Sequence, residues 1–354
     1  MRIDRVGRLC GDIEKSCANI GRLIQVMEVC GTHTVALFRL GIRSLLPKNL
    51  KLLSGPGCPV CVTEQAYIDT VIELACRDDC IIATYGDMLR VPGRETSLEK
   101  LARKNIRIVL SADDAVKLAR QHPDKTVVFV AVGFETTTPA TAVAVGQAAE
   151  LKNFTVLCGH KRVLPAMETL LSGRNDKIDA FLCPGHVSVI IGSDAYRPLV
   201  ERFKRPCVVA GFEAEQILAG LAEICSQLEK NAPSVGSVYS LAVSPQGNKI
   251  AQSLIEKFFE PCDGPWRGLG NIPQGCLKLK SQYGRFDAAR RFGLTMEDCP
   301  EPAGCLCGQV LCGLLDPDKC PLFGKKCAPD HPVGPCMVST EGACAAWYKY
   351  GPER

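Results

Sequence analysis

No segment of this 354-residue sequence is apolar for long enough to cross a membrane. The longest apolar stretch, residues 126–134, is far shorter than the roughly 20 residues that a membrane-spanning helix needs. Charged residues occupy the N-terminal segment, where a secretory signal would carry its apolar core. The net charge is only +4 and Lys and Arg form no run, so no nucleic-acid or membrane-binding face is indicated. We therefore expect a cytoplasmic protein that binds neither nucleic acid nor membrane.

Several familiar binding patterns are missing as well. Neither a Walker phosphate loop nor a GxGxxG turn occurs, which disfavours nucleotide chemistry. Zinc fingers and ribbons carry paired CxxC knuckles, whereas this sequence has a single CxxC, Cys58 to Cys61. The composition, 46% hydrophobic with 32 Gly and 23 Pro, is that of a globular α/β protein with many turns. At this length two or three domains are expected.

Cysteine, in contrast, is abundant. The chain has 21 cysteines, an odd number, and is too long to need disulfide staples, so a reducing compartment is indicated. There, thiols are buried apolar groups, metal ligands or redox groups. The core interpretation is favoured for nine cysteines in apolar or helical surroundings: Cys10, Cys17, Cys76, Cys80, Cys158, Cys183, Cys207, Cys225 and Cys262.

Between residues 51 and 243, apolar strands alternate with helices, a pattern typical of parallel βαβ units. Strands are predicted at residues 27–30, 50–54, 80–84, 106–111, 126–132, 155–158, 180–183, 206–211 and 237–243. Helices are predicted at residues 13–26, 35–46 and 64–76.

Three pairs of short motifs recur in the same order and suggest two related α/β halves. VCGTHT resembles VGFETT, PGC resembles PGH, and YGDM resembles AGFE. Each motif follows a predicted strand, and ligands of parallel sheets bind beyond the C-terminal ends of strands. We expect domains at residues 1–129 and 130–250, and a third, cysteine-rich cluster-binding region at 251–354.

The C-terminal region has little apolar periodicity and contains eight cysteines in its last part. A segment of this kind needs a cross-link, which in a reducing compartment means metal. The long, irregular cysteine spacing and the proline after Cys320 favour an iron–sulfur cluster over zinc. The candidate ligands are Cys299, Cys305, Cys307, Cys312, Cys320, Cys327, Cys336 and Cys344.

Cys58 and Cys61 lie between a predicted strand and the N-terminus of a predicted helix. The helix field and the neighbouring thiol both favour thiolate, which predicts a lowered pKa and a reversible disulfide. Half of a zinc knuckle is the alternative. In the CGTHT motif, Cys30 and His33 are three residues apart and suit either a metal site or a buried core.

Further turn motifs each place an acid or a histidine after a strand: GDM with Asp87, GFETTT with Glu135, PGHVS with His186 and GFE with Glu213. Individually these residues are typical of turns and helix caps, but their shared position suggests one cleft.

Taken together, CGTHT, GPGCPVC, GDMLRVPG, GFETTTP, PGHVSVIIG and the tail CPLFGKKCAPDHPVGPCMVSTEGACAAWY resemble the hydrogenase maturation protein family HypD. The resemblance extends from about residue 25 to residue 348. It implies a factor that helps to build the iron–dicyano–carbonyl moiety of nickel–iron hydrogenases. The implied partners are the small chaperone HypC, the cyanide-donating protein HypE and, indirectly, the hydrogenase large-subunit precursor.

The resemblance also assigns roles to individual residues. It implies a [4Fe–4S] cluster on Cys305, Cys320, Cys327 and Cys344. Cys30 is implied to bind the iron under assembly, a transient Fe(II) with cyanide and carbonyl ligands, with His33 beside it. Cys58 and Cys61 are implied to form a redox pair, with Cys336 as a possible electron relay. Asp87, His186 and Glu341 would line the site.

We expect an assembly scaffold and electron donor rather than a conventional turnover enzyme. Two other functions compete with this hypothesis. One is a cluster-linked thiol–disulfide reductase acting on a partner protein, and the other is a binding protein whose cluster only folds the tail.

Overall fold

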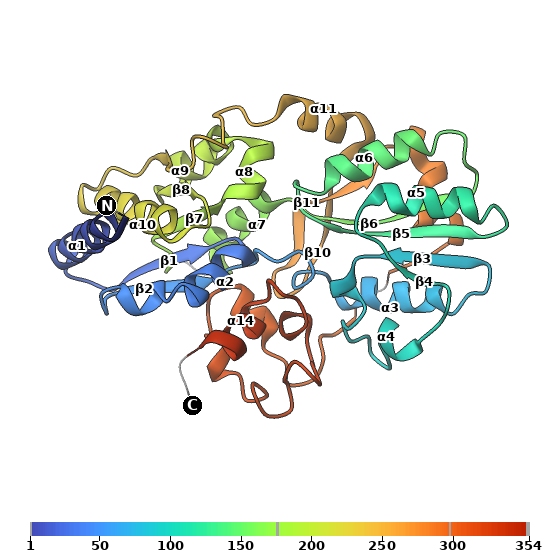
Figure 1. The fold of residues 1–354 in the computed structure, drawn as a ribbon. Coiled ribbons are helices and arrows are strands. Elements are labelled where there is room, and N and C mark those ends of the chain that lie inside the picture. Colours follow the sequence, from blue (N-terminus) through green and yellow to red (C-terminus); the bar gives the residue numbers. More distant parts are fainter. Residues whose placement is uncertain (1, 175–176, 297–298, 352–354) are drawn as a thin grey trace.

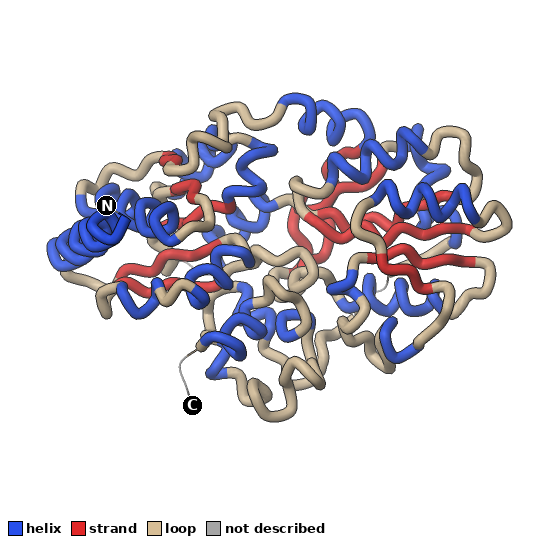
Figure 2. Tube along the Cα trace, in the orientation of Figure 1, coloured by secondary structure: helices blue, strands red, loops and turns tan. Residues whose placement is uncertain are grey.

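The computed structural model describes residues 2–174, 177–296 and 299–351. Two α/β units lie side by side, and the C-terminal region packs beneath the junction between them (Figure 1). This region consists of short helices joined by loops (Figure 2). The expected α/β class with parallel sheets is confirmed. No described helix combines the length and the apolar character that crossing a membrane requires.

The first unit contains a five-stranded parallel sheet with strand order β2-β1-β7-β8-β9. The strands are β1 (Ile24–Glu28), β2 (Leu50–Ser54), β7 (Ala180–Pro184), β8 (Cys207–Ala210) and β9 (Val235–Ser237). Helices α1 (Arg2–Ile20) and α10 (Ala214–Glu229) bury one face of the sheet. Other helices of this unit are α2 (Gly31–Arg39), η1 (Ile42–Leu45), α7 (Val163–Thr169), η3 (Leu170–Arg174), α8 (Gly185–Ile191), η4 (Ser193–Tyr196) and α9 (Arg197–Phe203).

The second unit contains a four-stranded parallel sheet with strand order β4-β3-β5-β6. Its strands are β3 (Cys80–Thr84), β4 (Ile106–Ile108), β5 (Thr126–Gly133) and β6 (Phe154–His160). Its helices are α3 (Gln65–Ala75), η2 (Gly86–Met88), α4 (Leu98–Leu101), α5 (Ala112–Gln121) and α6 (Thr138–Gln147). Strand β5 is buried along nearly its whole length, as its continuous apolar run indicates for a strand covered on both faces.

The two sheets alternate along the chain. After β2 the chain leaves the first sheet, builds the second sheet with β3 to β6, and then returns for β7 to β9. The expected boundary between residues 129 and 130 falls inside β5, so the divisions 1–129 and 130–250 do not follow the sheets. Parallel strands are joined by long crossovers, and motif order along the chain therefore does not show which sheet a strand joins.

Some predicted boundaries are confirmed and others are wrong. The strands at residues 50–54 and 80–84 and the helix at residues 64–76 are confirmed. The helix predicted at residues 13–26 ends at Ile20, because Gly21 has a φ of 67° and stops it, and β1 follows.

Two more predictions differ from the structure. The helix predicted at residues 35–46 starts earlier, as α2, and gives way to the short helix η1 after Arg39. The strand predicted at residues 237–243 lies earlier, as β9, and a turn follows it.

Strands β10 (Phe259–Trp266) and β11 (Gly270–Leu279) form an antiparallel hairpin that the sequence pattern did not predict. β10 contains two prolines, a glycine and a register shift between Cys262 and Gly264, so its apolar alternation is lost. Trp266 is 2% exposed and stacks on Phe134, which joins the hairpin to the second unit. Helix α11 (Lys249–Phe258) precedes the hairpin, and η5 (Ser281–Phe286) and α12 (Ala288–Phe292) follow it.

The C-terminal region is held against α2. Its helices are α13 (Cys307–Leu311), η6 (Pro317–Lys319), η7 (Pro335–Met337) and α14 (Ala343–Tyr350). The rings of Phe38 in α2 and Trp347 in α14 meet with centroids 5.2 Å apart, and the Arg43 guanidinium lies over both. These contacts bring the cysteine-rich tail to the helix that carries the CGTHT motif.

Candidate functional site

Cys30 and the CxxC loop leave the first sheet at the same edge. Strands β1 and β2 pair in parallel with Glu28 opposite Ser54, so the segments after them start side by side. The Gly57 carbonyl accepts a hydrogen bond of 3.1 Å from the Gly31 amide. A β-carbon at Gly57 would lie 2.3 Å from the Cys30 nitrogen, so only glycine fits this approach.

The Cys30 thiol is buried at the N-terminus of α2, where Cys30 is the N-cap residue. Burial, followed by the nearby Glu341 carboxylate, raises the pKa of the thiol to about 11. Hydrogen bonds from the His33 amide and from Thr32 act in the opposite direction. The thiol is therefore protonated at neutral pH and must lose its proton when it binds a metal.

Cys58 and Cys61 form a buried pair in the loop between β2 and α3. The Cys61 amide donates a hydrogen bond of 3.2 Å to Cys58 Sγ, and the two residues are 3% and 0% exposed. The predicted lowering of the pKa is wrong for Cys61. Burial raises the pKa of this thiol well above its ordinary value, and hydrogen bonds with the thiols of Cys336 and Cys58 add to the effect. Helix α3 begins only at Gln65, so the Cys61 thiol lies beyond the direct reach of the amides at the N-terminus of this helix.

Ser339 and Thr340 of the C-terminal region connect the CxxC loop to Asp87. The Cys58 thiol donates to Ser339 Oγ (3.3 Å), and the Ser339 hydroxyl donates to Asp87 Oδ2 (2.9 Å). The amide and hydroxyl of Thr340 donate to the same carboxylate oxygen. Sequence reasoning missed both residues, although the Ser-Thr-Glu run closely follows Cys336 and was a usable signal.

Glu341 lies over the CGTHT motif. Its Oε1 accepts a hydrogen bond from the Thr32 hydroxyl, and a β-carbon at Gly31 would lie 2.5 Å from Glu341 Cβ. Residues 339–341 therefore bring Cys30, Cys58 and Asp87 into one site with Glu341.

His33 and His186 both pack against the ring of Phe212. The centroids of the two imidazoles lie 4.8 Å and 4.2 Å from the centroid of Phe212. His33 Nε2 donates to the Gly211 carbonyl (3.0 Å), and among the described residues Nδ1 has no partner. Burial lowers the pKa of His33 to about 4, so the ring is neutral. Phe212 is part of the GFE turn motif, in which the sequence pattern pointed to Glu213 instead.

A small pocket in the C-terminal region is lined by all four cysteines that the family resemblance implies as cluster ligands. Its lining consists of Cys305, Leu306, Cys307, Val310, Cys320, Leu322, Phe323, Cys327 and Cys344. Cys307 thus joins the four implied ligands, and the rest of the wall is apolar. A [4Fe–4S] cluster is held by four cysteine thiolates, and this pocket offers five thiols in an otherwise apolar wall.

Backbone amides also approach these sulfurs. The Val333 amide donates to Cys327 Sγ (3.4 Å), and a β-carbon at Gly334 would lie 2.8 Å from Cys305 Sγ. Gly334 is therefore the glycine that lets backbone approach the thiols, whereas Gly342 packs on the Cys336 carbonyl.

Within residues 2–174, 177–296 and 299–351, no three His, Cys, Asp or Glu side chains are grouped closely enough to hold one metal ion. Each thiolate of a [4Fe–4S] cluster binds a different iron, so its ligands do not need to converge on one ion. The pocket has thiol donors, an otherwise apolar wall and a backbone amide that donates to one of its sulfurs. These three features fit a [4Fe–4S] cluster.

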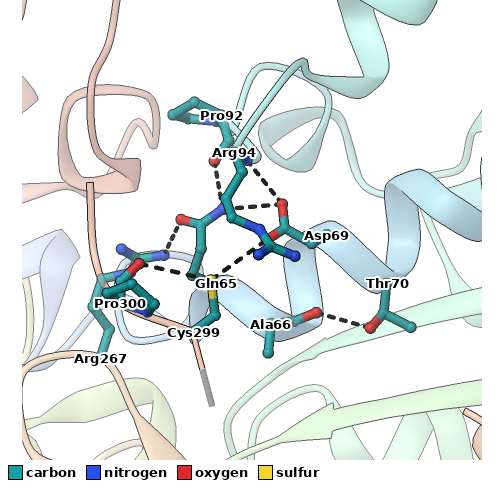
Figure 3. Close-up of polar contacts among 9 residues, drawn as sticks. All are labelled: Gln65, Ala66, Asp69, Thr70, Pro92, Arg94, Arg267, Cys299 and Pro300. Atoms are coloured by element: carbon teal, nitrogen blue, oxygen red, sulfur yellow. Dashed lines mark hydrogen bonds and ion pairs between the residues drawn. The ribbon is translucent and has the colours of Figure 1, made fainter. Parts of the chain in front are cut away.

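The other tail cysteines differ in position. Cys336 is fully buried and hydrogen-bonds the thiols of Cys307, Cys344 and Cys61, so it links the pocket to the CxxC loop. Cys299 lies elsewhere, near Asp69 and the Pro300 carbonyl, as Figure 3 shows. The Cys312 thiol donates to the Gly268 carbonyl.

Comparison with known proteins identifies the family of this chain. The family model HypD, described as "Hydrogenase formation hypA family", matches residues 4–351. Hydrogenase maturation factor HypD of Azotobacter vinelandii is 45% identical over 344 residues, which cover 94% of this chain and 91% of the relative. The Escherichia coli K12 protein of the same name is 44% identical over 336 residues, covering 93% and 90%. Hydrogenase maturation factor HypD of Rhizobium leguminosarum is 41% identical over 362 residues, covering 98% and 94%. The chain belongs to the HypD family of hydrogenase maturation factors.

Proposed function

We propose that this protein acts in hydrogenase maturation as the scaffold on which the iron–dicyano–carbonyl moiety of a nickel–iron hydrogenase is assembled, and as electron donor for that assembly. The observation that carries the proposal is the contact of residues 339–341 with three upstream motifs, which gathers Cys30, Cys58 and Asp87 around Glu341. We further infer that it works in the cytoplasm with HypC as chaperone and HypE as cyanide donor. The hydrogenase large-subunit precursor is served indirectly.

In this proposal Cys30 binds the iron under assembly, which is a substrate of the protein. A single thiolate leaves several positions of Fe(II) open for cyanide and carbonyl. Because burial keeps the free thiol protonated, iron binding must release a proton. The Glu341 carboxylate, which acts on the pKa of this thiol, is the proposed acceptor. Buried, neutral His33 packs on the Phe212 ring, and this packing limits water near the cargo.

Cys58 and Cys61 are the proposed two-electron donor. Oxidation of the pair forms one S–S bond and releases two electrons and two protons. Two electrons break the S–CN bond of a thiocyanate delivered by HypE and give a thiolate and cyanide. Hydrogen bonds run from the Cys58 thiol through the Ser339 hydroxyl to Asp87 Oδ2, which makes this carboxylate the proposed acceptor of the Cys58 proton.

The pocket would hold the [4Fe–4S] cluster on Cys305, Cys320, Cys327 and Cys344. When bound, such a cluster supplies electrons one at a time. Cys336 is the proposed relay, since its thiol hydrogen-bonds Cys61 on one side and two pocket cysteines on the other. Leucine and phenylalanine side chains in the pocket wall keep water from the ligands.

The experiment is spectroscopy on protein purified anaerobically with its chaperone from a host that matures hydrogenase. Infrared spectra should contain cyanide and carbonyl stretches, and Mössbauer spectra should separate cluster iron from a second iron site. Infrared spectra without these stretches would contradict the scaffold. A Mössbauer spectrum without cluster iron would contradict the electron-donor role.

A further inference from the structure

Arg267, at the end of the hairpin strand β10, is a buried arginine that the proposed chemistry does not use. It is 2% exposed. Its Nε donates to the Thr63 carbonyl (3.0 Å) and its Nη2 donates to Gln65 Oε1 (3.1 Å). Figure 3 shows the guanidinium directed to Gln65 at the start of α3, next to Pro300.

Among residues 2–174, 177–296 and 299–351, no carboxylate forms an ion pair or hydrogen bond with this guanidinium. Both acceptors are neutral, and Nη1 is buried without a hydrogen-bond partner in the described part of the chain. Arg267 lines a cavity that two acidic residues, Glu64 and Glu301, also border. Glu64 is ion-paired with Lys161 (2.8 Å), and Glu301 forms no ion pair with Arg267 among the described residues. A buried charge without a counter-charge is strongly unfavourable, so the surroundings should supply an anion.

The position of Arg267 indicates which anion this is. On one side its backbone and side chain bind the loop after the redox pair, at Val62 and Thr63. On the other side the next residue, Gly268, packs on Gly308 of α13, where a β-carbon would lie 2.3 Å from the Gly308 α-carbon.

Helix α13 starts at Cys307, two residues after Cys305, so the pocket cysteines lie directly beyond this contact. A hydrogen bond with Cys307, followed by burial, raises the pKa of the Cys305 thiol, and the Arg267 charge acts in the opposite direction.

We propose that Arg267 is the buried counter-charge of the iron–sulfur cluster and raises its reduction potential, an inference that rests on the proposed function. Four thiolates give a [4Fe–4S] centre a net negative charge, and reduction adds one more. A fixed cation in a low-dielectric region stabilises the reduced state more than the oxidised state. Cluster potentials depend on net charge and on hydrogen bonds near the sulfurs, and Arg267 supplies the charge.

A purely structural role is the competing explanation, because Arg267 also ties the hairpin to the CxxC loop through two hydrogen bonds and to the start of α3 through a third. The two roles depend on different properties of the side chain. The structural role needs the planar fork of donors, which lysine lacks. The electrostatic role needs the positive charge, which lysine keeps and glutamine loses.

The experiment is a redox titration of the anaerobically purified full-length protein, followed by absorbance, in wild type, Arg267→Gln and Arg267→Lys. Arg162→Gln is the matched control, since Arg162 donates to the Gln274 carbonyl of the same hairpin. Iron and sulfide contents are measured first. At fixed potential, Arg267→Gln should lower the ratio of reduced to oxidised cluster about tenfold, which is 59 mV for a one-electron couple. Arg267→Lys and Arg162→Gln should stay near wild type.

Each other outcome is decisive. Arg267→Gln with full cluster content and an unchanged potential overturns the proposal. If Arg267→Gln loses the cluster and Arg267→Lys keeps it, the cluster needs the positive charge, which supports the proposal. If both variants lose the cluster, the planar donor group of Arg267 acts structurally, which overturns the proposal. Wild-type protein without iron and sulfide would overturn the proposed electron-donor function itself, and this inference with it.

Discussion

Glu341 occupies the space beside Gly31 so closely that a β-carbon on Gly31 would lie 2.5 Å from Glu341 Cβ and 2.4 Å from the Glu341 carbonyl oxygen. The two residues are separated by almost the whole chain, and this contact places the tail on the CGTHT motif. The site is therefore assembled by long-range packing, and small changes at the contact should disturb it selectively.

Gly31→Ala is expected to push residues 339–341 away from the CGTHT motif. The inserted methyl group has no space, and overpacking of this kind costs about 1–3 kcal/mol of unfolding free energy. Urea unfolding measures the loss, and infrared spectroscopy of the anaerobic complex should show weakened cyanide and carbonyl stretches. Gly11→Ala in α1 is the control, because it has no neighbouring atom within 4 Å and should gain up to about 1 kcal/mol. Equal stability of Gly31→Ala and wild type would contradict the packing argument.

Ser339→Ala should interrupt the hydrogen bonds between Cys58 and Asp87 without unfolding the protein. Loss of the hydroxyl removes the proposed route of the Cys58 proton, so oxidation of the dithiol should slow about tenfold, or about 1.4 kcal/mol in the barrier. The reaction is followed by alkylating the free thiols at successive times and counting the labelled cysteines by mass spectrometry. Thr340→Val is the matched control, since its amide still donates to Asp87. Equal oxidation rates in Ser339→Ala and wild type would remove Ser339 from the route.

Glu135→Gln should change how stability depends on pH. Glu135 is 7% exposed and accepts a hydrogen bond from the Val163 amide (3.1 Å), and burial raises the pKa of its carboxyl to about 7. Between the ordinary carboxyl pKa and pH 7, the folded chain keeps a proton here that the unfolded chain has lost. The contribution of Glu135 therefore lowers the unfolding free energy as pH rises, by up to about 1.4 kcal/mol per pH unit.

Glutamine keeps the acceptor and has no proton to lose. The unfolding free energy of Glu135→Gln, relative to wild type, should therefore increase from pH 5 to pH 7 and level off above that. Urea titrations of both proteins at each pH measure the difference, in which the contributions of all other groups cancel. A difference that stays constant with pH would mean that the carboxyl ionises alike in the folded and unfolded chains.

Local sequence signals predicted the parts of the fold that local physics decides. Residues 50–54 and 80–84 are short apolar runs between turn residues, and both are strands at those residues. The hairpin strand β10 was missed because prolines, a glycine and a bulge remove its alternation. The exchange of strands between the sheets was missed because crossovers leave no local mark.

The candidate site divides in the same way. Cys58 and Cys61 were recognisable from their own spacing, but their contact with Ser339 depends on how the tail packs. Arg267 carried no signal either, because a single arginine in a glycine-rich segment resembles a surface residue until its burial is known. The low pKa predicted for Cys61 failed because the helix starts too late and burial dominates.

Cys320→Ser should remove the proposed cluster, since Cys320 is one of the five cysteines that line the pocket. A serine hydroxyl is a poor iron ligand compared with a thiolate, so bound iron and sulfide and the visible absorbance should fall severalfold. Cys299→Ser is the matched control, because that thiol lies near Asp69 and does not line the pocket. Loss of the cluster in Cys299→Ser, or its full retention in Cys320→Ser, would contradict the ligand assignment.

Cys30→Ala separates the scaffold from a thiol–disulfide reductase. The variant lacks the proposed ligand of the cargo iron, whereas Cys58, Cys61 and the five pocket cysteines remain. The second iron signal in Mössbauer spectra and the cyanide and carbonyl stretches should disappear, and hydrogenase activity in the host should be lost, while cluster iron and dithiol exchange stay near wild type. Cys80→Ala, which removes a fully buried thiol from β3, controls for the loss of packing alone. Hydrogenase activity that survives in Cys30→Ala would favour the reductase, because a reductase needs the dithiol and the cluster but no third thiolate.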